Sequence, residues 1–164
     1  MICNAMIYRI ILILVFLSVI PAAKASPLYI SEVSRLDFAV LEIPSRGRRQ
    51  HIEIPPDGRG YKGNGEVLSG MPQRGEYFIT GPFTEHPQTI SINIENVVTG
   101  SSELQLDKFK GIYDNRHIGN FPVWGLPSPG AGGKTLFLGA RLEYTSNIAE
   151  GTYHPSYNIV IVYE

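Results

Sequence analysis

Short runs in which hydrophobic and polar residues alternate recur along most of the chain, a pattern typical of β-strands. At residues 88–94, Ile90, Ile92 and Ile94 alternate with polar residues, as expected for a strand with one buried face. The longest run places Leu136, Leu138, Ala140, Leu142 and Tyr144 at every second position. Similar runs predict strands at residues 35–43, 51–54, 76–80, 102–106 and 157–163. No stretch supplies the crossover helices that a parallel α/β fold needs, so that class is excluded.

Turn-forming residues separate these runs. The 164 residues include 17 Gly and 12 Pro, and residues 55–58 (PPDG) form a strong turn signal. Eight or nine strands spaced about ten residues apart predict an all-β fold, an antiparallel β-sandwich with immunoglobulin-like or Greek-key connections. Residues 113–134 are rich in Gly and Pro and lack clear strand signals, so we expect a long loop there. A loop of this length is usually functional or mobile.

The first 25 residues have the features of a secretory signal peptide. A basic residue, Arg9, precedes an apolar stretch at residues 10–20, and Ala23 and Ala25 place small residues before a cleavage point. The apolar stretch is shorter than the roughly 20 residues that a membrane-spanning helix needs. We therefore expect cleavage near Ser26. The mature chain is then a single exported domain at residues 26–164, without a membrane span, in the periplasm, on the cell surface or outside the cell.

Removal of this segment changes what chemistry the chain can carry. Two of the 14 basic residues and none of the 15 acidic residues are lost, so the formal net charge goes from −1 to −3. This small, mixed charge does not favour nucleic-acid or membrane-surface binding. The single cysteine, Cys3, also leaves, which excludes disulfides, thiolate metal sites and thiol redox chemistry from the mature domain.

The sequence offers little support for an enzyme or for a cofactor. Residues 132–135 (GGKT) resemble the end of a phosphate-binding loop, but Ser128 stands where that motif requires Gly, and a strand follows rather than a helix. The four histidines are too widely spaced to suggest a metal site: His51, His86, His117 and His154. No G-x-S-x-G motif occurs. The acidic residues of the predicted strands are interpreted as solvated positions: Glu32, Asp37, Glu103 and Asp107.

Two features suggest binding. The basic residues in 46–49 (RGRR) are expected at a hairpin tip, where they suit an acidic glycan or an acidic partner protein. Trp124, in the predicted 113–134 loop, suits stacking on a sugar ring. Other aromatic residues fit either such a platform or the core: Tyr77, Phe78, Phe137 and Tyr144.

The C-terminal segment resembles the end of a family of small secreted bacterial β-sandwich domains, domain-of-unknown-function family 4402. The resemblance rests on residues 138–142 (LGARL), 149–153 (AEGTY) and 157–163 (YNIVIVY), with further similarity at residues 36–38 (LDF) and 77–81 (YFITG). Members commonly have Gly after the Phe of the first of these N-terminal motifs, whereas this chain has Ala39. The resemblance implies a secreted β-sandwich.

The same C-terminus is similar to subunits of chaperone–usher pili, which carry Gly about fourteen residues from the end and a penultimate Tyr. Gly151 and Tyr163 occupy these positions. The resemblance implies that the last strand pairs first with a periplasmic assembly chaperone and then with an N-terminal strand of a neighbouring subunit. Its apolar face would consist of Tyr157, Ile159, Ile161 and Tyr163. Residues 27–33 would be the donor, with Leu28 and Ile30 filling the groove. Many pilins carry a disulfide that this mature chain lacks.

Two functions remain open at this stage. The first is a non-enzymatic structural subunit, like a pilin or an adhesin, that assembles by β-strand addition. The second is a self-contained secreted domain that binds a glycan or another surface ligand through Trp124 and its loop. Neither function requires a cofactor.

Overall fold

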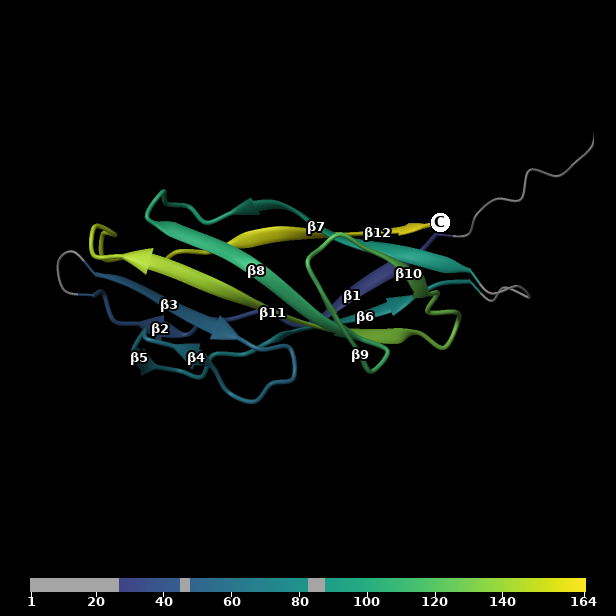
Figure 1. Cartoon of the computed structure of the whole chain (residues 1–164), viewed down its shortest axis with the longest axis horizontal. Coiled ribbons are helices and arrows are strands. Elements are labelled where there is room, and N and C mark those ends of the chain that lie inside the picture. Colours follow the sequence, from purple (N-terminus) through teal and green to yellow (C-terminus); the bar gives the residue numbers. More distant parts are fainter. Residues whose placement is uncertain (1–26, 45–47, 83–87) are drawn as a thin grey trace, which may run out of the picture.

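The computed structural model describes residues 27–44, 48–82 and 88–164, and these residues form antiparallel β-structure without a helix (Figure 1). The all-β prediction is therefore confirmed. The strands are β1 (Tyr29–Ser34), β2 (Val40–Leu41), β3 (Arg49–Ile54), β4 (Lys62–Gly63), β5 (Val67–Ser69), β6 (Gly75–Thr80), β7 (Thr89–Val98), β8 (Leu104–Tyr113), β9 (Arg116–Gly119), β10 (Val123–Pro127), β11 (Lys134–Thr145) and β12 (Ser156–Tyr163). The predicted signal peptide and residues 46–47 of the basic cluster lie outside the described residues.

The long strand β11 organises the larger sheet. It pairs with β8 along one edge, while its other edge pairs with β6 in its first half and with β3 in its second half. Strand β1 adds to β6, β4 adds to β3 and β9 adds to β8. The alternation predicted for β11 is confirmed, because its apolar positions at 136, 138, 140, 142 and 144 are all buried.

A smaller sheet, in the order β10–β7–β12, faces one half of the larger sheet. Ile90 and Ile92 of β7 are fully buried and belong to the same apolar cluster as Ile79, Leu136 and Leu138 of the larger sheet. Over the other half, a second cluster joins β3, β8 and β11 to Phe38, with apolar residues of β2 and β5 packed against it. The molecule is thus a β-sandwich in which the two-stranded pair β2–β5 supplements the smaller sheet.

Three details of the sequence prediction are corrected. The strand expected at residues 35–43 is interrupted, because Ala39 has a φ of 61° and its N–H donates to the Asp37 carboxylate at 2.8 Å. The segment 113–134 contains β9 and β10 rather than one long loop. The structure has more strands than the eight or nine expected, since several are only two or three residues long. The immunoglobulin-like topology stays a prediction.

The first and last strands of the described chain both lie at sheet edges. Strand β1 pairs only with β6 in the larger sheet, and β12 pairs only with β7 in the smaller sheet. The start of β1 and the end of β12 lie close together, on either side of Gly81. A Cβ built on Gly81 would lie 2.7 Å from Tyr163 Oη and 3.1 Å from Leu28 Cδ2. Figure 1 shows the start of β1 and the C-terminus at the same end of the molecule. The two edge strands therefore flank one space at the surface of the sandwich.

Candidate functional site

A groove of about 660 Å³ lies between β1 and β12 and opens to solvent. It is lined by Ile30, Glu32, Arg35, Leu36 and Tyr77 on one side and by residues 155–160 on the other. The volume falls within the range of sites that bind ligands. Its walls are two edge strands that belong to different sheets, β1 in the larger and β12 in the smaller.

The inner face of β12 is apolar but incompletely covered. Four alternate side chains point inward and are half-buried: Tyr157, Ile159, Ile161 and Tyr163. In contrast, Ile92, which is opposite Ile161 in the β7 ladder, is fully buried. The difference arises because β7 has neighbours on both edges, whereas β12 has only the groove on its outer edge.

Strand β1 shows the same lack of cover. Ile30 is 41% exposed even though Ile79, its partner on β6, is fully buried. The next inward position holds Glu32, which forms an exposed ion pair with Arg35 (Nε–Oε1 3.2 Å). An inward-pointing charge on an edge strand is a common device that prevents another strand from pairing there. The β1 side of the groove is therefore a wall with a protected edge.

Two tyrosines form the floor of the groove. The hydroxyls of Tyr77 and Tyr157 share a 2.6 Å hydrogen bond that joins the two sheets. Burial raises the pKa of both phenols, and the mutual hydrogen bond raises the pKa of Tyr157 further. Both side chains therefore remain neutral far above physiological pH.

Phe109 supports this floor from below. Its ring meets the ring of Tyr157 edge-on, with 5.2 Å between the centroids. A bulge in the β8–β11 pairing, at which Lys108 has a φ of 50°, brings Phe109 to the core side of the strand. Sequence reasoning missed Phe109 because a bulge shifts the alternation by one residue.

The free edge of β12 is unprotected. Its eight residues, 156–163, include no charged residue and no proline, and most are β-branched or aromatic. Other edges in the described structure carry the usual protection. Strand β10 has a bulge and ends in Pro127, while β4 and β9 are short and carry Lys62 and Arg116. Natural proteins rarely leave a long, uncharged edge bare, because its unpaired N–H and C=O groups recruit other strands.

The structure brings together part of the predicted strand-addition set. Ile30, Tyr157 and Ile159 line the groove. Leu28, Ile161 and Tyr163 pack on the first core cluster beside it. Gly151 lies in the exposed segment before β12, where a Cβ would approach only the Tyr153 ring, at 3.9 Å.

The expected donor segment is already paired within its own chain, and Trp124 lies apart from the groove. Most of residues 27–33 form β1, paired with β6 of the same chain, rather than a free extension. Trp124 is on β10 and does not contact the groove.

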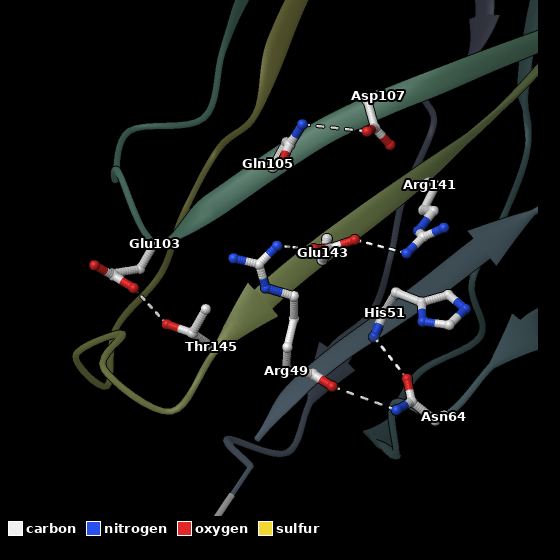
Figure 2. Close-up of polar contacts among 9 residues, drawn as sticks. All are labelled: Arg49, His51, Asn64, Glu103, Gln105, Asp107, Arg141, Glu143 and Thr145. Carbon is white, nitrogen blue, oxygen red and sulfur yellow. Dashed lines mark hydrogen bonds and ion pairs between the residues drawn. The ribbon is translucent and has the colours of Figure 1, made fainter. Parts of the chain in front are cut away.

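The outer face of the larger sheet carries polar groups that are linked by hydrogen bonds and ion pairs (Figure 2). Glu143 of β11 accepts hydrogen bonds from Arg49 and Arg141, each at 2.6 Å. Burial raises the pKa of Glu143, but these two guanidinium groups outweigh it and the net pKa is lowered. Glu103 accepts a bond from Thr145, and Asp107 one from Gln105.

Other candidate chemistry is not assembled in the described part of the chain. Residues 27–44, 48–82 and 88–164 contain no group of three or more His, Cys, Asp and Glu side chains that could hold a metal ion. His86 lies outside these ranges. The GGKT segment leads directly into β11, and Gly133 packs under the Phe78 ring. Among the same residues, no helix has the length and apolar character needed to cross a membrane.

Comparison with protein-family models, with curated proteins and with solved structures finds no match for this chain.

Proposed function

We propose that this protein is an exported, non-enzymatic structural protein of the bacterial cell surface that assembles by β-strand addition. A strand from a neighbouring subunit, or from a periplasmic chaperone before assembly, would pair with the free edge of β12. The observation that carries this proposal is the uncharged edge of β12 beside an open groove in which Ile30 and Ile159 are only partly covered.

Strand addition accounts for both features at once. Backbone hydrogen bonds to the new strand would satisfy the unpaired groups along β12, and every second side chain of that strand would enter the groove. Apolar side chains there would cover Ile30 and Ile159, which are only partly covered in the isolated chain. Burial of apolar surface adds roughly 25 cal/mol per Å².

The resemblance of the C-terminus to pilus subunits supports the same function. Gly151 and Tyr163 match the positions of the pilin motif, and β12 is an edge strand, as that function requires. For residues 27–33 to serve as donor, β1 must leave β6 of its own chain and enter a neighbouring molecule. Its exposure favours such an exchange, since five of its six residues are exposed.

The test is an unheated denaturing gel of the full chain exported to a bacterial periplasm. Strand-added chains separate slowly without heat, so a heat-labile ladder of bands is expected. Ile159→Asp places a charge in the groove and should abolish the ladder. Ile30→Asp tests the opposite wall at a more exposed position, where the fold tolerates a charge better.

The matched control is Leu68→Asp, on β5, where the side chain is 61% exposed and distant in the fold from the groove. It should leave the ladder intact. A single monomer band from an unmodified protein that unfolds cooperatively would refute the proposal, because the sandwich would then be complete without a partner.

A further inference from the structure

The outer face of the smaller sheet carries an exposed aromatic residue beside polar groups. Trp124 lies in a bulge of β10, between the pairs Val123↔Ile92 and Leu126↔Ile90, and therefore opposite Ser91 of β7. Ser91 pairs in turn with Val162 of β12. These three residues form a row across the three strands, on the side of the sheet that faces away from the core and the groove.

The structure holds Trp124 in an exposed position. Its indole is 65% exposed, whereas Leu126 on the same strand is buried. Gly125, with a φ of 66°, forms the bulge, and its N–H donates to the carboxylate of Glu164 at 2.9 Å. That carboxylate reaches across β7 from the end of β12 and fixes the bulge. The aromatic surface is thus available without a conformational change.

The charges around Trp124 restrict what can bind. Strands β7, β10 and β12 contain no Lys, Arg or His, and this face carries Glu95 and Glu164. An anionic ligand would meet these carboxylates, and the described residues of the three strands offer it no cation. A neutral ligand that combines an apolar surface with hydroxyl groups fits the row better.

We propose that this face binds a neutral saccharide. The C–H face of one pyranose ring stacks on the indole of Trp124, whose π-face is electron-rich. Ring hydroxyls donate to the carboxylate of Glu164, which has lone pairs beyond the one used by Gly125, and exchange hydrogen bonds with Ser91. This function differs from strand addition, because it uses the outer face of the smaller sheet and leaves the groove free.

Trp124 is the single tryptophan of the chain, so intrinsic fluorescence reports directly on the proposed site. Titration with N-acetylchitotriose, cellotriose or lactose should shift or quench the emission saturably with at least one of the three. Heparin, which is anionic, should have no effect. Calorimetry then compares variants: Trp124→Ala should abolish the binding heat, whereas Tyr61→Ala, a control at another exposed aromatic residue, should retain it.

Three results would overturn the proposal. The first is an unchanged emission spectrum with all three neutral probes. The second is a Trp124→Ala variant that still binds with the affinity of the unmodified protein. The third is a blue shift that depends on protein concentration alone, which would mean that a second copy of the chain covers Trp124. Each variant is also checked for the ladder on the unheated gel, so failure of saccharide binding remains separate from failure of strand addition.

Discussion

Variants of the Tyr77–Tyr157 hydrogen bond test whether water has access to the groove. The bond joins the two sheets at 2.6 Å, but its two ends differ in environment. Both tyrosines line the groove, but Tyr77 is 6% exposed whereas Tyr157 is half-buried. Removal of either hydroxyl therefore leaves the other hydroxyl without its partner, in a different environment in each case.

Tyr157→Phe leaves the hydroxyl of Tyr77 buried without a partner, and that desolvation costs about 1–3 kcal/mol. Tyr77→Phe leaves the hydroxyl of Tyr157, the more exposed of the two side chains, and we expect water to replace the lost partner there. The cost is then about 0.5–1.5 kcal/mol, the usual net value of one hydrogen bond. The double variant removes both polar groups, and we expect it to be no less stable than Tyr157→Phe alone.

The assay is urea denaturation of the purified protein, followed by circular dichroism, with free energies compared at a common m-value. Two outcomes would refute the reasoning. If Tyr77→Phe costs more than Tyr157→Phe, the groove is not accessible to water. If the two single costs add in the double variant, the hydroxyls are not coupled. Occupation of the groove by an added strand should remove the difference between the two single variants.

Two further predictions concern stability. The pKa is raised, chiefly by burial, for four tyrosines: Tyr77, Tyr113, Tyr144 (to about 12) and Tyr157. The contribution of these tyrosines to the free energy of unfolding is complete below pH 10. It is lost as the pH rises through their folded-state pKa values, by up to about 1.4 kcal/mol per pH unit for each phenol. Phenolate absorbance and circular dichroism should change together above that pH, and independent titration of the phenols would contradict this. Leu138→Ala, at a fully buried position of β11, should cost about 2–5 kcal/mol in the urea assay, and a loss below 1 kcal/mol would mean that the core is not packed there.

The strands whose burial follows a strict alternation could be predicted from the sequence. β11 is the clearest example, because one face of its apolar run is buried along its whole length. The segment 35–43 shows where this logic fails. Leu36, Phe38 and Val40 alternate there as in a strand, but a left-handed residue at Ala39, bound to Asp37, breaks the strand. Such local side-chain bonds compete with strand pairing and leave little trace in hydrophobicity.

The sequence predicted one side of the candidate groove, the apolar face of β12, but not the rest of it. The apolar face of residues 157–163 predicted a strand that accepts a partner, but the same pattern suits a strand that completes its own sheet. Which of the two roles the last strand has depends on the strands that flank it. Contacts between residues far apart in the chain determine those neighbours. Tyr77 and Phe109 form and support the groove floor from β6 and β8, although neither is near β12 in sequence.

The sequence by itself determined the class of fold, since alternation with period two, frequent turn residues and the lack of helical periodicity act locally. It also predicted which face of β7 and of β11 is buried. Only the tertiary structure decided that β1 pairs with β6, that β12 remains at an edge, and that Trp124 stands on an outer sheet face instead of in a long loop. Local pattern determines how a residue points relative to its own strand. Strand order and edge exposure arise from the packing of the whole chain.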